Sequence, residues 1–174
     1  KAIPNYKVLV LSDYGKGTLS RKTVAFFINL ANRQNIPVIV DPKGVNYSAY
    51  AGAYLITPNL VELGLASSLP TDSDEAIAAA AEHLRKTCQL ENILVTRSSR
   101  GMTLVEPDRV SHFDTNVKEV FDVSGAGDTV VSFLAAGLAS SLKIEESVKI
   151  ANIAAGIVVN KTGTSVAHLS EMLI

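Results

Sequence analysis

The segment Pro37-Val-Ile-Val-Asp-Pro42 is a short apolar run between two prolines, and it gives a clear indication of the fold class. Proline cannot donate a hydrogen bond to a strand ladder, so the prolines confine the predicted strand to residues 38–41. The strand is apolar at successive positions instead of alternating, which is typical of a parallel sheet that is buried on both faces. It ends in a polar residue, Asp41.

Outward from this segment, the preceding residues show a strand followed by a helix. Residues 7–11 form a compact apolar run that ends in Ser12-Asp13 and a glycine-rich turn, which predicts a buried strand that opens into a loop. In residues 19–35, apolar side chains recur at helical spacing, at Val24, Phe27, Ile28 and Ala31. A strand, an amphipathic helix and a second strand in this order indicate a parallel βαβ unit.

The same alternation continues downstream. A polar loop leads to a third strand over residues 53–57, ended by Pro58, and residues 93–96 form a fourth. Between these strands, the capping-box spacing of residues 72–75 begins a helix whose apolar face contains Ile77, Ala81, Leu84 and Cys88. The alternation of strands and helices therefore extends through the first half of the chain.

A hairpin and two helices complete the predicted elements. Residues 102–106 and 109–113 predict two antiparallel strands about Pro107-Asp108. Two smooth helical stretches follow, over residues 129–140 and 144–160. The predicted fold is α/β and Rossmann-like: an open, mostly parallel sheet with helices on both faces and right-handed crossovers.

Length and composition indicate one globular domain. The chain has 174 residues, of which 47% are hydrophobic and 19% charged, enough to bury a normal core. Sixteen Lys and Arg residues against seventeen Asp and Glu residues leave a net charge of −1, which argues against nucleic acid or an anionic membrane as partner. A single cysteine, Cys88, argues against a disulfide framework and predicts a cytoplasmic location. Because the sequence opens at Lys1 without a methionine, we expect a fragment.

The segment Asp122-Val-Ser-Gly-Ala-Gly-Asp128 carries the strongest chemical signal. Two glycines allow a tight turn, and the helix predicted after them directs unpaired N–H groups and its positive dipole end toward one spot, as an anion site requires. At the helix start, Asp128 is placed to accept the proton of an attacking hydroxyl in phosphoryl transfer. From these residues alone, an ordinary turn with Asp128 as a helix cap explains the pattern equally well.

Together with other motifs, this segment resembles the C-terminal signature of the ribokinase (PfkB) family of carbohydrate kinases. Residues 59–62 resemble the family's Asn-x-x-Glu motif, residues 96–101 its nucleotide-side turn, and residues 152–163 its adenine-side helix and loop. The resemblance implies a ribokinase-like fold in which residues 1–174 are the C-terminal, nucleotide-binding and catalytic part of a single kinase domain. The N-terminal part and the lid of that domain are expected to be missing.

One branch of the family, the heptose 7-phosphate kinases of lipopolysaccharide biosynthesis, shares further motifs with this chain. These are Leu11-Ser-Asp-Tyr-Gly-Lys-Gly17, Asp41-Pro-Lys-Gly44 and Thr57-Pro-Asn59. The resemblance implies ATP-dependent phosphorylation of the anomeric hydroxyl of heptose 7-phosphate. Two alternatives remain open: a family kinase for another sugar, and a nucleotide-binding fragment without catalysis. The sequence contains no His-x-Gly-His motif of the adenylyltransferase to which relatives in this branch are often fused.

The resemblance assigns roles to individual residues. It makes Asp128 the catalytic base, with an anion hole formed by Gly125, Ala126 and Gly127. The nucleotide-binding residues that it implies are Asn59, Glu62, Thr96, Arg97, Gly101, Asn152 and Gly163. On the helix that contains Asn152, the apolar residues Ile150, Ile153, Ala154 and Ile157 are expected to belong mainly to the core.

Metal ions are implied at two places. Asn59 and Glu62 would order a hydrated Mg²⁺ ion together with the phosphates of ATP, although by sequence alone an N-capped helix start is the commoner explanation of this pair. Asp122 would either cap its own turn or, as the resemblance implies, help to hold K⁺ with backbone carbonyls near residues 159–163.

Asp13, Lys16 and Lys43 lie in predicted loops at strand ends. The lysines would meet either the phosphates of the nucleotide or the phosphate of the sugar, although most loop lysines are only solvated. The expected partners are therefore ATP and a sugar phosphate, with a homodimer compatible with the resemblance. Without the N-terminal half of the kinase domain, we expect the chain to have little activity.

Overall fold

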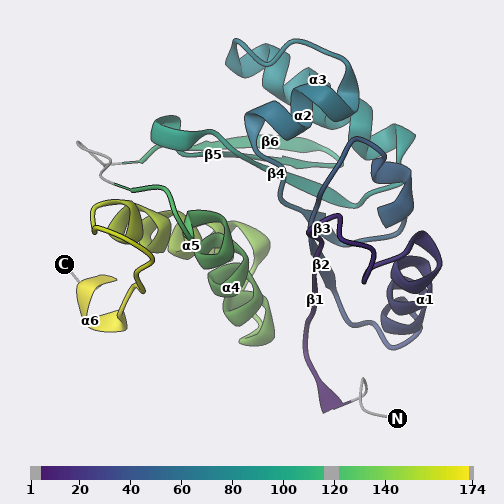
Figure 1. The fold of residues 1–174 in the computed structure, drawn as a ribbon, viewed down its shortest axis with the longest axis horizontal. Coiled ribbons are helices and arrows are strands. Elements are labelled where there is room, and N and C mark those ends of the chain that lie inside the picture. Colours follow the sequence, from purple (N-terminus) through teal and green to yellow (C-terminus); the bar gives the residue numbers. More distant parts are fainter. Residues whose placement is uncertain (1–4, 116–121, 173–174) are drawn as a thin grey trace. The chain divides into compact units, whose positions relative to one another are not determined.

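The computed structural model describes residues 5–115 and 122–172, which form two compact units (Figure 1). The first comprises residues up to Arg97 and the segment Thr103–Ser111, and the second comprises Ser98–Met102 and the residues from His112 onward. The first unit carries most of a sheet and three α-helices, and the second carries a helix pair with a short final helix.

Six strands form one sheet in the order β1-β2-β3-β4-β5-β6. Their bounds are β1 Leu9–Ser12, β2 Val38–Asp41, β3 Leu55–Ile56, β4 Asn92–Thr96, β5 Met102–Glu106 and β6 Arg109–Phe113. The first four strands are parallel, with Leu11 opposite Val40 and Ile56 opposite Ile93. The two-residue connection between β5 and β6 leaves only the antiparallel arrangement for that pair. The predicted mixed sheet is therefore confirmed.

Helices α1, α2 and α3 pack against one face of this sheet and share a hydrophobic core with it. Their bounds are α1 Arg21–Asn32, α2 Leu60–Ser67 and α3 Asp74–Thr87. The core joins Ile28 of α1, Leu63 of α2 and Ile77 of α3 to alternate strand residues such as Val40 and Ile93. The strand residues between these, Ile39, Leu55, Leu94 and Leu104, are also fully buried. Strands β2 to β5 are thus buried on both faces, as their continuous apolar runs predict. The first strand differs from the buried strand that we expected over residues 7–11, because β1 spans Leu9–Ser12 and Val10 is 38% exposed.

The segment between β2 and β3 differs from the polar loop that we expected. Residues Tyr47–Tyr50 form a short 3-10 helix, η2, and both tyrosines are buried, with their ring centroids 5.9 Å apart. Polar neighbours conceal this apolar contribution in the sequence, because only every third residue of a 3-10 helix faces the same way. The segment after β2 is therefore anchored in the core at two points.

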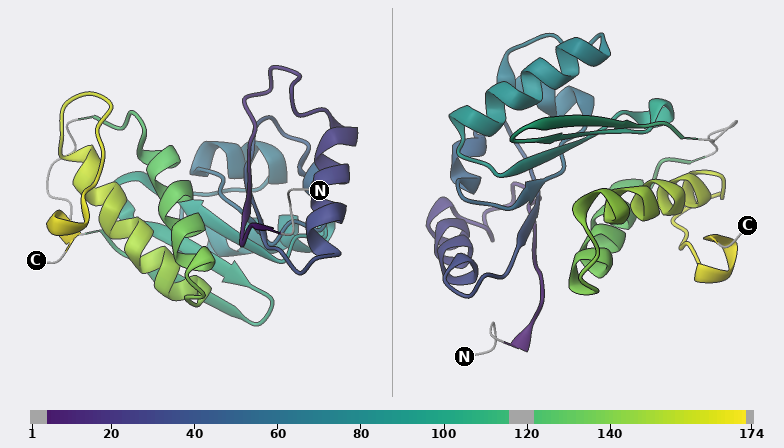
Figure 2. Two further views of the ribbon diagram at one scale, coloured as in Figure 1. Left: turned by 90° about the horizontal axis from the view of Figure 1, so that it is seen from below. Right: turned by 180° about the vertical axis from the view of Figure 1, so that it is seen from behind.

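The second unit is built on two helices, α4 (Ala126–Ala139) and α5 (Ile144–Val159), which lie side by side in both views of Figure 2. A short helix, α6 (Leu169–Met172), follows. Another 3-10 turn, η3 (Ser98–Arg100), belongs to the same unit. Helix α4 begins at Ala126, three residues before the predicted start, so the glycine signature forms its first turn.

Close packing of α4 on α5 depends on Gly137. A Cβ atom added at Gly137 would lie 2.5 Å from Oγ and 2.8 Å from Cβ of Ser147, which is itself buried. We expect Gly137→Ala to lower the free energy of unfolding by about 1–3 kcal/mol, because overpacking outweighs the better helix propensity of alanine. Urea denaturation of the chain measures this loss.

Gly64 of α2 is a matched control for this substitution. Its added Cβ would meet nothing closer than 3.6 Å, so Gly64→Ala is expected to leave stability unchanged or to raise it by up to about 1 kcal/mol. Equal effects at both glycines would contradict the role that we give to Gly137.

Candidate active site

In the first unit, polar residues gather where the parallel strands end. Asp13 follows β1, Asp41 ends β2, and the Asp13 amide donates to the Asp41 carbonyl at 3.0 Å. The Ser12 hydroxyl donates to Oδ2 of Asp41 at 3.3 Å. Because the carboxyl ends of parallel strands meet at one edge of the sheet, the loops that carry Asp13 and Lys43 are neighbours. A Cβ added at Gly15 would lie 3.5 Å from Cγ of Lys43, in agreement with this.

Asn59 and Glu62 form a capping box at the start of α2. The side chain of Asn59 accepts from the Glu62 amide at 2.9 Å, and Oε2 of Glu62 accepts from the Asn59 amide at 3.1 Å. The N-capped helix start that explains this pair by sequence alone is therefore present. It does not exclude a ligand, because each carboxylate oxygen can accept more than one hydrogen bond.

Lys43 is paired with Glu62 across the strand ends. The Lys43 ammonium lies 3.0 Å from Oε1 of Glu62, and this hydrogen bond and charge raise the pKa of the lysine. The Lys43 side chain remains more than half exposed, so the pair lies at the surface, where it contributes little to stability. Its cationic end is therefore accessible to a phosphate.

Of two other predicted nucleotide residues, Thr96 ends β4 and Arg97 directly follows it. Thr96 forms a parallel bridge with Asn59, and its amide donates to the Pro58 carbonyl at 3.0 Å, so the structure brings Thr96 and Asn59 together. Arg97 is different, because only 2% of it is exposed and its Nη1 lies 2.7 Å from Oδ1 of Asp74. We therefore revise the role of Arg97: its guanidinium attaches the end of β4 to the first turn of α3, and direct side-chain contact with a nucleotide is not expected.

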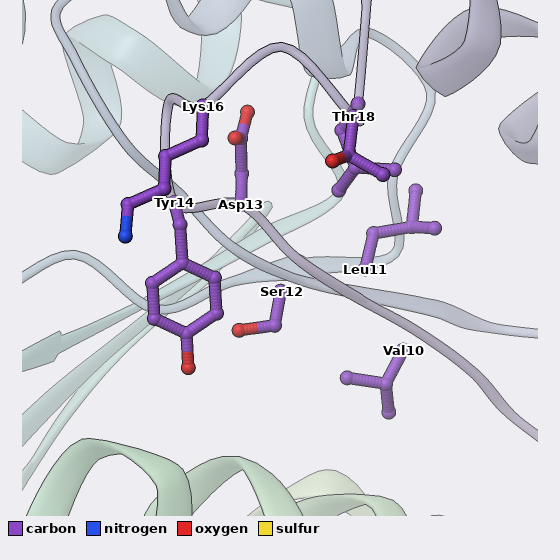
Figure 3. A pocket seen from close by; sticks show the side chains of 8 residues that line it. Val10, Leu11, Ser12, Asp13, Tyr14, Lys16 and Thr18 are labelled. Carbon is purple, nitrogen blue, oxygen red and sulfur yellow. The ribbon is translucent and has the colours of Figure 1, made fainter.

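Residues from β1 and the loop after it line a hollow of about 580 Å³. The lining includes Asp13, Tyr14 and Lys16, shown in Figure 3, with Val10 and Leu11 at the strand end and Thr18 and Leu19 beyond the loop. Tyr14 and Lys16 are exposed. The hollow thus combines a carboxylate, a cation and an aromatic ring beside apolar strand residues, a lining that suits a polar ligand with a charged group.

In the second unit, Gly125 is the N-cap of α4 and adopts a left-handed conformation, with φ 79°. Glycine reaches this region without the strain that a Cβ would bring. The Ala126 amide donates to the Val123 carbonyl at 3.2 Å, and Thr129 bonds the Gly125 carbonyl through both its amide and its hydroxyl. Because the Ala126 amide already has a partner, it is less available to an anion than we expected, whereas the predicted anion-hole roles of Gly125 and Gly127 stay predictions.

Asp128 itself lies exposed in the first turn of α4. The Ser132 hydroxyl donates to its backbone carbonyl at 2.7 Å, one turn along the helix. Its exposure leaves the carboxylate open to a ligand, and its role as a base stays a prediction.

Asp122 connects the signature to the loop after α5. Its Oδ1 accepts from the Ser124 amide at 2.8 Å, and its Oδ2 accepts from the Gly163 amide at 3.1 Å. These hydrogen bonds, with the Ser124 amide first, lower the pKa of the Asp122 carboxyl because they favour its charged form. Asp122 therefore does cap its own turn, and it also places Gly163 (φ 74°) beside the signature.

Helix α5 presents one apolar face to the core and a second face that is more open. Val148, Ala151 and Ala154 are buried, whereas Ile153 is 50% exposed, so the expectation that Ile153 belongs to the core is wrong. The Nδ2 atom of Asn152 donates to the Asp114 carbonyl at 2.9 Å, which fixes the chain after β6 beside α5. The adenine-side role of Asn152 stays a prediction.

Gly101, the remaining predicted nucleotide residue, closes the turn after η3. Its amide donates to the Ser98 carbonyl at 3.1 Å, and its φ is 80°. A Cβ at this position would lie 1.9 Å from the Phe113 carbonyl oxygen. The glycine is therefore explained by backbone packing, independently of any ligand.

Sequence reasoning missed two residues of this region, Tyr50 and Asp74. The Tyr50 hydroxyl donates to Oδ2 of Asp13 at 2.9 Å and accepts from the Lys43 amide at 3.2 Å. Asp74 was placed only in a helix-start motif, and the observed N-cap of α3 is Ser73. No local sequence signal could reveal either contact, because the partners lie 37 and 23 residues away along the chain.

The fold and these residues define a class of enzyme, which combines an open, mostly parallel sheet with polar strand ends and a glycine turn that enters a helix with an acid in its first turn. The chain belongs to the pfkB family of carbohydrate kinases, whose sequence model matches residues 1–171. Over the described residues, none of the helices has the length and apolar character needed to cross a bilayer.

The similar proteins include two named bifunctional protein HldE. That of Paramagnetospirillum magneticum is 50% identical over 175 residues, and that of Pasteurella multocida is 49% identical over 172 residues. These alignments cover 100% and 98% of this chain but 36% of each relative. The chain therefore spans about a third of the length of the curated relatives that it matches.

Solved structures confirm the ribokinase-like fold. Arabidopsis thaliana ribokinase, complexed with ribose and ATP, superposes with a TM-score of 0.85 at 22% identity, over 98% of this chain and 56% of the ribokinase chain. Phosphofructokinase-2 from Escherichia coli, in complex with potassium, gives 0.83 at 21% identity, over 95% of this chain and 54% of the other. At these identities the likeness establishes the fold alone.

Proposed function

We propose that this chain is the nucleotide-binding and catalytic part of a kinase that transfers the γ-phosphate of ATP to the anomeric hydroxyl of heptose 7-phosphate. The product is heptose 1,7-bisphosphate, a precursor of the lipopolysaccharide core. Family membership supports the kinase class. The sequence identity of 49–50% to the two HldE proteins supports the heptose branch, which the motifs resemble. The observation that carries the proposal is Asp128 in the first turn of α4, directly after the left-handed turn at Gly125.

In this proposal Asp128 acts as general base. Its carboxylate accepts the proton of the anomeric hydroxyl as the sugar oxygen attacks the terminal phosphorus, and ADP leaves with the electron pair of the broken bond. The amides at the start of α4 lower the energy of the charge that develops on the transferred phosphate. Helix α4 orients these amides, and Asp122 supports the same turn through Ser124.

The donor set of the described residues fits a Mg²⁺ ion that keeps most of its water. In residues 5–115 and 122–172 no group of three or more His, Cys, Asp or Glu side chains could hold a metal. Mg²⁺ is usually bound through one or two carboxylates together with substrate phosphates. Glu62, supported by Asn59, would hold the ion through water, and the bound ion would neutralise charge on the phosphates. Lys43, paired with Glu62, would contact a phosphate.

Calorimetric titration of the chain with ATP separates the candidate classes. We expect ATP to bind and the affinity to fall by about tenfold or more when Mg²⁺ is removed, because the phosphates then lose their charge-neutralising ion. A regulatory nucleotide-binding module would bind equally well with and without the ion. A purely structural domain would not bind ATP at all, and either result would contradict the proposal.

A further inference from the structure

Tyr50 is a buried polar residue that no function discussed so far uses. Only 2% of it is exposed, yet its hydroxyl lies between two loops at the carboxyl end of the sheet. It donates to Oδ2 of Asp13 in the loop after β1, at 2.9 Å. In the loop after β2 it accepts from the Lys43 amide, and the Lys43 carbonyl, at 3.2 Å, is a more distant second acceptor for its hydrogen. Both loops carry residues with proposed ligand roles, so the hydroxyl is a single link between them.

The geometry shows how this link would orient Asp13. Oδ1 of Asp13 accepts from the Gly15 amide at 2.8 Å within its own loop, and Oδ2 accepts from Tyr50 at 2.9 Å. With one oxygen held by the loop and the other by the core, the carboxylate plane cannot rotate freely. Each oxygen retains acceptor capacity, which a hydroxyl of a sugar could use.

Tyr50 is well suited to remain a donor. Burial raises its pKa to about 12, and the neighbouring Asp13 acts in the same direction. The phenol therefore stays protonated throughout the physiological range. Its ring packs against Tyr47 in the core, so its position is set by hydrophobic contacts and not by the two loops that it joins.

We propose that Tyr50 is a positioning residue, whose hydroxyl fixes the Asp13 loop to the Lys43 loop and so holds the Asp13 carboxylate ready for the acceptor sugar. The link itself is a statement about the structure of the first unit. Its consequence for catalysis rests on the proposed function, so the two are tested separately.

Tyr47 supplies a matched control in the same 3-10 helix. It is equally buried, at 1% exposure, and within the described residues its hydroxyl has no hydrogen-bond partner. Tyr47→Phe and Tyr50→Phe each remove one buried oxygen from one of two adjacent rings. Only Tyr50→Phe removes a link between loops, so a difference between the variants reports the link and not the loss of a buried hydroxyl.

The first test is amide hydrogen exchange of the chain, followed by NMR at Gly15 and Lys43. In Tyr50→Phe, the Lys43 amide loses its hydrogen-bond acceptor directly. The Gly15 amide keeps its acceptor, Asp13, so its exchange rate rises only if the loop loosens. We expect about tenfold faster exchange at both, with the amides of β2 unchanged, and less than twofold change at both in Tyr47→Phe. An unchanged rate at Gly15 in Tyr50→Phe would overturn the proposal.

The second test is steady-state kinetics of the full-length protein. Tyr50→Phe is expected to raise the KM for the sugar phosphate about five- to tenfold, while the KM for ATP stays within twofold and Tyr47→Phe matches the unmodified protein. Equal KM values for the sugar in all three proteins, despite loosened loops, would refute the catalytic consequence. If the full-length protein transfers no phosphate to any sugar, the proposed function fails, and the exchange rates alone still decide the link.

Discussion

Asp128→Asn is expected to lower the turnover of the full-length kinase by about two orders of magnitude or more, with the affinity for ATP largely kept. Asparagine has the same shape but cannot accept the proton of the attacking hydroxyl. Asp128 is exposed in the first turn of α4, so its replacement costs only the interaction with the helix dipole, about 0.3–1 kcal/mol. Steady-state turnover and calorimetric ATP affinity measure the two effects separately.

Glu75→Gln is the control for this substitution. Glu75 is likewise an exposed acid in the first turn of a helix, α3, so its loss has a similar effect on the helix dipole without touching the glycine signature. We expect Glu75→Gln to keep normal turnover. If Asp128→Asn also keeps near-normal turnover, Asp128 is not the base.

Gly101→Ala has the largest expected effect on stability. The added Cβ would lie 1.9 Å from the Phe113 carbonyl oxygen and 2.9 Å from its carbonyl carbon, both backbone atoms that cannot rotate away. The residue also has φ 80°, which alanine adopts only with strain. We expect a loss of more than about 3 kcal/mol in the free energy of unfolding, measured by urea denaturation, or a chain that does not fold.

Gly44 isolates the contribution of the backbone angle. Its φ is also 80°, but an added Cβ would meet nothing within 4 Å. Gly44→Ala should therefore cost only the conformational strain, about 1 kcal/mol. Similar losses at both positions would show that the contact with Phe113 does not matter.

The order of the elements could be predicted because each strand is a local apolar run with a clear end. The prolines around residues 38–41 and the two-residue turn before Arg109 fixed the strands β2, β5 and β6 at their observed bounds. The third strand is shorter than predicted, with two paired residues, Leu55–Ile56. Strand length depends on how far the neighbouring strands run alongside, which a single segment does not encode.

Helix α4 shows where local rules gave the wrong boundary. Two glycines argued for a loop up to Asp128, but the helix begins at Ala126 and includes Gly127. The cost of a glycine in a helix is small, and contacts made elsewhere along α4 exceed it. The packing of α4 against α5 is a tertiary contact, and the 14 residues of α4 alone do not reveal it.

The candidate site was predictable in its positions but not in its contacts. Asp13 and Asn59 follow strands and Thr96 ends one, and residues at the carboxyl ends of parallel strands gather at one edge of a sheet. The sequence does not show that Asn59 and Glu62 cap each other, that Arg97 is buried against Asp74, or that Tyr50 holds Asp13. These contacts depend on side-chain directions set by packing between distant segments.

The central claim is that the protein transfers phosphate from ATP to the anomeric oxygen of heptose 7-phosphate. Phosphorus NMR of the full-length protein with ATP, Mg²⁺ and a panel of sugars and sugar phosphates tests it most directly. We expect a new phosphate signal coupled to the anomeric proton of the heptose, equal in amount to the ADP formed, and no comparable signal with the other acceptors. Transfer to a different sugar in preference to the heptose, or ATP consumption without a phosphorylated sugar, would contradict it.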